Sequence, residues 1–315
     1  MRLRAPLFAF IIALVLSPSV HATKTADSYR KAAEQGDASA QFNLGCCYDD
    51  GLGVEKDAKE AVKWYRKAAE QGVAWAQALL GLCYGEGTGV EKNLEEAVKW
   101  YRKAAKHGVA IAQFNLGVCY EQANGVDKDL KEAATWYRKA AEQGFAKAQS
   151  KLGDCYAQGT GVEKNLKTTV VWWRKAAEQG FAEAQFGLGL CYREGQGVEE
   201  DLKEAVKWWR KAAEQGYAKA QYNLGVCYVK GGGVEKDEVE GLAWLIVGAT
   251  LGDSNSETAR RGTEGNLDRR SVLKANERAK RLMQQIEQVK VTRKNDKDYL
   301  FDSEVRYRFV PLKGQ

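Results

Sequence analysis

The chain has 315 residues and a formal net charge of +6 at pH 7, and hydrophobic residues make up 44% of it. Residues 23–252 carry 31 basic and 32 acidic side chains, whereas residues 253–315 carry 15 basic and 10 acidic ones. A nucleic-acid-binding protein concentrates basic charge on its main surface, so this balance argues against nucleic acid as a partner. The basic excess near the C-terminus is either a contact for an acidic partner or a membrane surface, or simply a solvated face.

Residues 1–22 have the layout of a secretory signal peptide. Arg2 and Arg4 precede an apolar run over residues 7–16, and a small-residue cleavage site follows. The apolar run is shorter than the ~20 residues that a membrane-spanning helix needs. We therefore expect a periplasmic or secreted protein without a transmembrane segment after signal cleavage. An uncleaved signal that anchors the chain is the alternative.

A pattern of 36 residues occurs six times over residues 37–252. Each copy contains a Leu-Gly pair, a Cys-Tyr pair and a tryptophan, as at Leu44-Gly45, Cys47-Tyr48 and Trp64. A fixed period of this length indicates a solenoid, a propeller or an array. Residues 23–36 resemble the end of a copy, so we expect this half-repeat to cap the N-terminal end.

Two helices are predicted in each copy. In the first copy, Ala40, Leu44 and Cys47 recur at helical spacing and hardly vary between copies, which indicates a buried stripe on a helix over residues 38–50. The second helix is expected to begin after Asp57, an N-cap residue that forms a capping box with Glu60.

The residues that end the second helix and the turn before it, and the packing role of its tryptophan, are also predicted. Gly72 suits the left-handed residue that closes a helix, and Gly53 suits a sharp turn between the two helices. The recurring tryptophan, Trp64 in the first copy, is expected to fill the space between stacked copies and not to bind carbohydrate.

The repeat resembles the Sel-1-like repeat family, a relative of the tetratricopeptide repeats. The resemblance rests on A-x-A-Q-x-x-L-G-x-x-Y over residues 38–48, G-x-G-V over 51–54 and W-Y-R-K-A-A-E-Q-G over 64–72. It covers about residues 29–252 and implies an adaptor or scaffold more than an enzyme. One helix pair cannot bury its apolar face, but stacked pairs can. The predicted fold is all-α: a right-handed α/α superhelical solenoid of helix-turn-helix repeats with a C-terminal capping helix.

The C-terminal part is expected to cover the end of the stack. The last copy is unusually apolar around Trp244, and a repeat array with an apolar end needs a cover. Residues 271–289, within a capping region over 253–289, place apolar side chains on one side of a helix. Residues 290–315 are predicted to form a basic tail.

The seven cysteines are predicted to be small buried hydrophobic residues. Six occupy one equivalent position in each copy: Cys47, Cys83, Cys119, Cys155, Cys191 and Cys227. Neighbouring helices lie ~8–10 Å apart, whereas a disulfide requires Cα atoms within ~7 Å. Relatives with two bridged cysteines in each unit are known in the family that the chain resembles, and the second cysteine is missing here.

Metal, cofactor and catalytic residues are not expected. His107 is the one histidine after the predicted signal, at a helix C-terminus that favours a cation. Residues 28–31 and 271–274 match S-x-x-K, but the S-D-N and K-T-G companions are absent, and both serines are expected to be helix N-caps. A cell-wall-directed penicillin-binding or β-lactamase-like hydrolase is the alternative function.

A partner-binding surface is predicted from variation between the copies. Four positions of each first helix, those of Ser39, Asn43, Cys46 and Asp50, form a variable row that we name the inner stripe. First helices of solenoids commonly line a concave wall on which extended partners dock. The prediction is therefore an exported scaffold that binds a protein or peptide, although solvated positions free to vary would give the same pattern. The predicted binding residues are Asn43, Trp75, Leu79, Ile111, Asn115, Lys147, Lys151, Glu183, Lys219 and Asn223.

Overall fold

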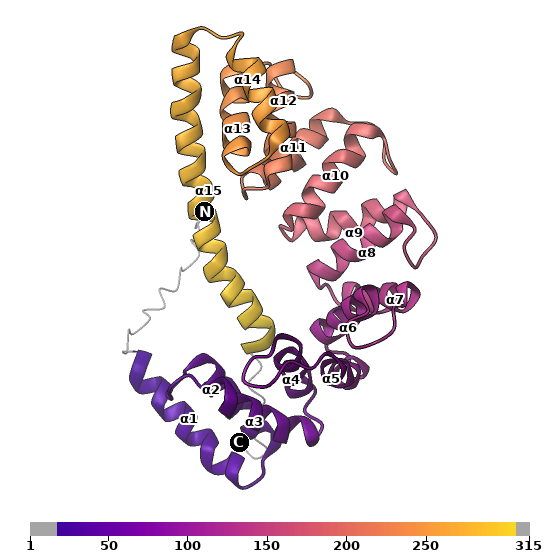
Figure 1. Cartoon of the computed structure of the whole chain (residues 1–315), viewed down its shortest axis with the longest axis vertical. Helices are drawn as coiled ribbons and strands as arrows, with labels where there is room; N and C mark the ends of the chain where they lie inside the picture. The colour runs from indigo at the N-terminus through magenta and orange to yellow at the C-terminus, as the bar shows by residue number, and fades with distance from the viewer. Residues whose placement is uncertain (1–17, 307–315) are drawn as a thin grey trace, which may run out of the picture. The chain divides into compact units, whose positions relative to one another are not determined.

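The computed structural model describes the backbone of residues 18–306 and the side chains of residues 26–292. The described backbone forms fifteen helices and no strand, in consecutive helix-turn-helix repeats (Figure 1), which confirms the all-α prediction. Two compact units contain these residues, an N-terminal unit over 18–92 and a C-terminal unit over 93–306.

Each of the six repeats contributes two helices. The first helices are α2 (Ala38–Asp50), α4 (Ala74–Glu86), α6 (Ala110–Gln122), α8 (Ala146–Gln158), α10 (Ala182–Glu194) and α12 (Ala218–Lys230). The second helices are α3 (Ala58–Glu70), α5 (Leu94–Lys106), α7 (Leu130–Glu142), α9 (Leu166–Glu178), α11 (Leu202–Ala213) and α13 (Glu238–Thr250). Helix α1 (Pro18–Glu34) precedes them, and α14 (Ser254–Glu264) and α15 (Arg269–Arg306) follow. The N-terminal unit thus contains α1–α4 and the C-terminal unit α5–α15.

The Leu-Gly pair forms the tightest packing inside each repeat. Leu44 is fully buried, as is the equivalent leucine of each later repeat. The neighbouring glycine leaves room for an aromatic ring from the second helix, because a Cβ on Gly45 would lie 2.6 Å from Cδ1 of Tyr65. The buried stripe of the first helix is therefore as predicted, and the glycine sets how closely the two helices approach.

The recurring tryptophan packs against the core between copies, as predicted, since Trp64 and Trp172 lie against the buried clusters that contain Leu44 and Leu152, but it is buried only in the fifth and sixth repeats. Trp64 and its equivalents in the second to fourth repeats are half-buried, while Tyr65 beside Trp64 is buried. A lysine three residues later, Lys67 in the first repeat, places its ammonium over the tryptophan ring at 4.1 Å from the centroid. Such a cation–π contact keeps one face of the indole near solvent.

The second helix begins at the predicted cap. Asp57 accepts hydrogen bonds from the backbone amides of Lys59 and Glu60, at 2.9 and 3.1 Å. The second half of the capping box does not form, because the Asp57 amide donates to the Tyr48 carbonyl at 2.9 Å. The Glu60 carboxylate pairs instead with Lys63.

The turn between the helices of one repeat touches the preceding repeat. A Cβ on Gly125 would lie 2.2 Å from the Leu94 carbonyl oxygen, so this close approach requires glycine as well as its positive φ of 69°. In the same turn Ala123 replaces a glycine and still adopts a left-handed conformation, with φ 59°. Gly72 closes α3 with φ 90°, as predicted.

The ends of the array are closed by additional helices. Helix α1 packs Ala26 and Ala33 against Ala40 and Leu44 of α2. The predicted cleavage point lies inside α1, while residues 1–17 of the predicted signal lie outside the described residues.

At the C-terminal end, α15 runs alongside α13 (Figure 1) and buries Ala279, Leu282 and Ile286 in a cluster with Trp244. The helix expected over residues 271–289 thus continues to Arg306. Residues 307–315 of the predicted tail lie outside the described part of the chain.

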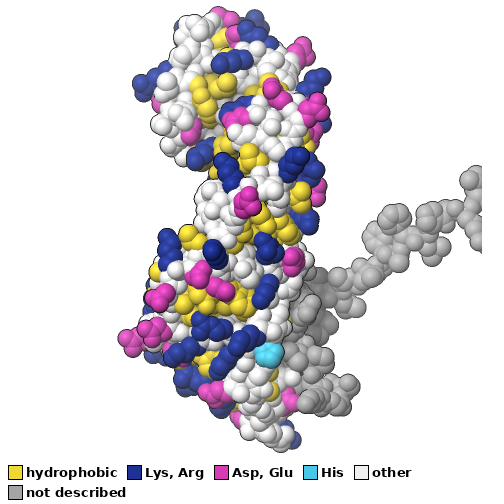
Figure 2. Space-filling view, turned by 90° about the vertical axis from the view of Figure 1, so that its right-hand side faces the viewer, with side chains coloured by type: hydrophobic (Ala, Val, Ile, Leu, Met, Phe, Trp, Pro, Cys, Tyr) yellow, Lys and Arg dark blue, Asp and Glu magenta, His cyan; other side chains and the backbone are white. Residues whose placement is uncertain are grey.

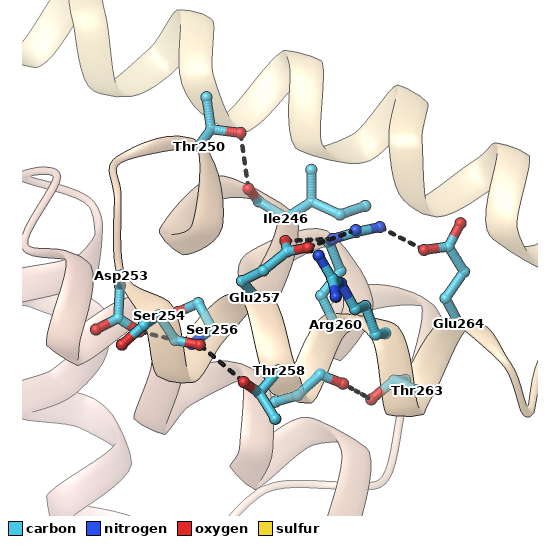
Figure 3. A network of polar contacts seen from close by, with 12 residues as sticks. Ile246, Thr250, Asp253, Ser254, Ser256, Glu257, Thr258, Arg260, Thr263 and Glu264 are labelled. Carbon is cyan, nitrogen blue, oxygen red and sulfur yellow. Dashed lines mark hydrogen bonds and ion pairs between the residues drawn. The ribbon is translucent and has the colours of Figure 1, made fainter.

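Helix α14 was not predicted as a separate element. It has the register of a seventh first helix, since its N-cap Asp253 lies six repeat lengths after the N-cap Asp37 of α2. Arg260 stands where the other first helices have their core leucine, and it pairs with Glu257 and Glu264 (Figure 3). The Gly252-Asp253 pair, which repeats Gly36-Asp37, is the sequence signal that identifies this helix.

Candidate protein-binding surface

Inner-stripe residues contact neighbouring helices in the C-terminal unit, and the residue beside the stripe takes part. Lys151 of α8 lies 3.2 Å from the Glu121 carboxylate at the end of α6. Trp173 reaches from α9 between α8 and α10, because it donates to Asp154 at 3.0 Å and would lie 2.9 Å from a Cβ on Gly187. The first helices are therefore joined directly as well as through their second helices.

Carboxylates on this surface are held by neighbouring aromatic side chains. The Tyr137 hydroxyl donates to Glu121 at 2.8 Å, and burial with this carboxylate holds the pKa of Tyr137 well above its usual value. Burial also raises the pKa of the Asp154 carboxyl above its ordinary value, against the opposing effect of the Trp173 indole. These groups give the surface fixed hydrogen-bonding positions.

The predicted binding residues differ widely in exposure. Asn43 is fully buried, and Leu79 and Ile111 are 7% and 8% exposed, so these three contribute mainly to packing. The half-buried residues are Trp75, Asn115, Lys151 and Asn223. The exposed residues are Lys147, Glu183 and Lys219, all in the C-terminal unit.

Two contacts missed by the sequence reasoning fix the spacing of the repeats. The first is an arginine on each of the first five second helices that donates to the tyrosine of the next first helix, as Arg138 does to Tyr156 at 2.7 Å. It recurs through Arg66, Arg102, Arg174 and Arg210, at distances between 2.5 and 3.1 Å.

The second contact is a ladder of glutamines. Buried Gln149 donates to the Ala141 carbonyl at 3.2 Å and accepts from Gln179 at 2.7 Å. Gln113 with Gln143 and Gln185 with Gln215 repeat the side-chain bond. The constant A-x-A-Q motif was the available signal, but it does not show which residue supplies the second glutamine.

Comparison with known proteins agrees with this architecture. The family described as Sel1 repeat matches residues 29–37, 38–73, 76–109, 110–145, 146–181, 182–217 and 218–253. The chain belongs to the Sel1 repeat family.

Solved structures resemble it as well. A Sel1 repeat protein from Oxalobacter formigenes is 38% identical with a TM-score of 0.61, and the match covers 74% of this chain and 97% of that one. The protein c5321 of uropathogenic Escherichia coli, described as a protective antigen with an SLR fold, is 32% identical over 84% of this chain and 72% of its own, with a TM-score of 0.39. None of the curated proteins is similar enough to match.

Sel1 solenoids are typical of protein–protein interaction scaffolds.

The thiols of the Sel1 repeats are free, and six of the seven cysteines are buried, Cys83 being half-buried. Burial raises the pKa of Cys47, Cys119, Cys155, Cys191 and Cys227 from the ordinary value of 9.0 to about 11. Since the thiolate is the reactive form, these side chains are weak nucleophiles at neutral pH. They behave as the packing residues that were predicted.

The two S-x-x-K serines do not lie where they were expected. Ser28 falls inside α1, and Ser271 is the third residue of α15, where its hydroxyl donates to Asp268 at 2.9 Å. Asp268 also accepts from the Ser271 amide, so the aspartate takes the capping role that the sequence reasoning gave to the serine.

Over residues 18–306, each helix is too short or too polar to cross a bilayer, and His, Cys, Asp and Glu side chains do not gather in threes at metal-binding distance. Acidic and basic side chains are mixed on the face that Figure 2 draws.

Proposed function

We propose that this protein is an exported scaffold that holds a partner protein or peptide on the concave face of its Sel1 solenoid. The observation that carries the proposal is the separation of constant and variable positions. Constant residues such as Leu116 and Leu152 are fully buried, whereas the inner stripe of the C-terminal unit places Lys147, Glu183 and Lys219 in solvent. A fixed frame with a changing surface suits recognition of another chain.

The chemistry of the exposed stripe favours an extended polypeptide. Half-buried Asn115 and Asn223 supply amides that donate to and accept from a peptide backbone. Lys147 and Lys219 attract carboxylates, while Glu183 between them attracts a basic side chain. We expect a partner segment of mixed charge with acidic residues opposite the two lysines.

Capture of partners from an exported fraction tests this surface. The triple variant Asn115→Ala, Lys147→Ala, Lys219→Ala should lose a bound partner that the unmodified protein retains, because both the amide and the charged contacts are gone. The matched control is Lys131→Ala with Lys203→Ala, which removes two exposed lysines from second helices. Equal capture by the triple variant, or equal loss in the control, would count against the proposed surface.

Export is supported by Arg2, Arg4 and the apolar run over residues 7–16. Cleavage after Ala22 would shorten α1 but keep Ala26 and Ala33, which pack on α2. N-terminal sequencing of the protein recovered from its native host is expected to begin near Thr23. Recovery of the intact N-terminus from the membrane fraction would favour an anchored form instead.

A further inference from the structure

In five of the six repeats the second helix carries an aromatic side chain at one equivalent position, and in the fourth repeat its ring lies between two adjacent first helices. The ring belongs to the residue after the recurring tryptophan, and these residues are Tyr65, Tyr101, Tyr137, Trp173 and Trp209. Trp173 shows the position best, because its indole lies against Gly153 of α8 and Gly187 of α10. We name this space the ring site.

Two positions on the first helix touch the polar edge or the face of the ring. Glu121 accepts from the Tyr137 hydroxyl at 2.8 Å, and Arg193, at the same position two repeats later, lies 5.7 Å from the Trp209 ring centroid. Asp154 accepts from the Trp173 indole. In the sixth repeat these two positions carry Val229 and Val226.

The ring site of the sixth repeat contains a leucine in place of an aromatic side chain. Leu245 stands at the ring position, and a cavity of about 280 Å³ remains beside it. Val226 and Val229 of α12 line one wall, and Ala259, Gly262 and Thr263 of α14 line the other, with Lys230, Glu238 and Asn266 also at the cavity. Ala259 is at the position of Gly187, the residue that Trp173 touches in the fourth repeat.

The cavity is large enough for the ring that it lacks. A cavity of about 150 Å³ with apolar walls binds benzene, so a phenyl group fits the larger volume here. A Cβ on Gly262 would meet no atom within 4 Å, which shows open space on the α14 side. Lys230 and Asn266 are exposed, so a ligand can enter between them.

We propose that this cavity receives one phenylalanine side chain of a bound polypeptide. The inference rests on the proposed function and deepens it, since Val226 belongs to the inner stripe along which the partner would lie. Phenylalanine is preferred over tyrosine because Val226 and Val229 replace the carboxylates that accept hydrogen bonds from the ring in earlier repeats, those of Asp154 and Glu121. The Glu238 carboxylate at the cavity is paired with Lys236. The Thr263 hydroxyl donates its proton to the Ala259 carbonyl at 2.9 Å (Figure 3), so it has no proton left to donate to the oxygen of a tyrosine ring.

Binding of N-acetyl-phenylalaninamide to the full-length protein, measured by saturation-transfer NMR, tests the cavity directly. Two variants fill it from opposite walls: Leu245→Trp restores the ring found in the fifth repeat, and Gly262→Leu adds a side chain from α14. Each should weaken binding at least tenfold, while Lys147→Ala, a distant inner-stripe change, should leave it unaltered. N-acetyl-tyrosinamide should bind at least threefold more weakly than the phenylalanine amide.

The inference is overturned if the unmodified protein does not bind the phenylalanine amide, if either filled and folded variant binds it as the unmodified protein does, or if the tyrosine amide binds equally well. Circular dichroism checks that the variants fold. The probe needs no natural partner, so failure here is distinct from failure of the scaffold. If the inner-stripe triple variant loses partner capture while both filled variants keep it, the scaffold proposal stands. This cavity would then be excluded as the anchor for the partner.

Discussion

At the scale of single residues, the glycine of the Leu-Gly pair decides how tightly each repeat packs. It faces the aromatic side chain of the second helix, and in the third repeat a Cβ on Gly117 would lie 2.7 Å from Cε1 of Tyr137. The same Cβ would lie 3.1 Å from the Ala133 carbonyl oxygen, which belongs to the backbone of α7. Because a backbone atom cannot rotate away, the two helices must separate to admit even a methyl group.

Gly117→Ala should therefore lower the free energy of unfolding by about 1–3 kcal/mol, the usual cost of an overpacked core. Urea denaturation measures this change. Gly262→Ala is the matched control, since a Cβ there meets nothing within 4 Å and alanine is the better helix former by about 0.5–1 kcal/mol. A Gly117→Ala protein as stable as the unmodified one would show that α6 and α7 do not pack as described.

At the scale of helices, the glutamine ladder ties the ends of α3, α7, α9 and α11 to the first helices of their repeats, and the sixth repeat lacks its donor. Gln221 is fully buried and donates to the Ala213 carbonyl at 3.0 Å. Its Oε1 has no hydrogen-bond partner among the described residues. The position that supplies the donor in the third to fifth repeats is occupied here by Leu251, which is 44% exposed.

Leu251→Gln is expected to raise the free energy of unfolding by about 1 kcal/mol, because it offers an amide donor to the unsatisfied oxygen of Gln221. Chemical denaturation of the purified variant measures the gain. Leu251→Glu has nearly the same shape but brings no donor at neutral pH, so it should give no gain. Equal stabilisation by both changes would mean that the ladder bond is not its source.

The helices themselves could be predicted from the sequence because their signals are local. Asp57 caps α3 through amides two and three residues away, and Leu44 recurs with helical spacing. The joints between repeats could not be predicted in this way, because Arg138 bonds to Tyr156 across 18 residues. A pattern that every copy shares does not show which copies are in contact. For the candidate surface, variation between copies did not predict which side chains are exposed. The positions of Asn43 and Lys147 both vary, yet Asn43 is buried and Lys147 is exposed.

At the scale of the whole molecule, the C-terminal capping helix α15 is attached to α13 by a bidentate ion pair as well as by apolar packing. Arg278 of α15 donates to both oxygens of Glu240 on α13, at 2.8 and 3.1 Å. Glu240 also accepts from the Trp244 indole at 3.0 Å, and its side chain is 16% exposed. Through Glu240, this ion pair connects the capping helix to Trp244, the last core tryptophan of the array.

Arg278→Ala should lower the free energy of unfolding by about 1–3 kcal/mol. The loss is smaller than for a fully buried ion pair because the arginine side chain is 37% exposed. Repeat arrays lose stability mainly where a neighbour is lost. Hydrogen exchange should thus become faster in α13–α15 while α6–α8 keep their protection. Arg281→Ala is the control, since its partner Glu277 lies 3.9 Å away at an exposed site. A uniform change along the chain would contradict this local role.

The arginine-to-tyrosine bond has a consequence for how such a chain changes in length. Every joint that it closes uses the same two residue types at the same separation, from Arg102 with Tyr120 to Arg210 with Tyr228. Deleting or duplicating 36 residues in phase therefore leaves each remaining arginine opposite a tyrosine. Unequal recombination within the gene can alter the reach of the protein by whole copies, and no new joint has to evolve.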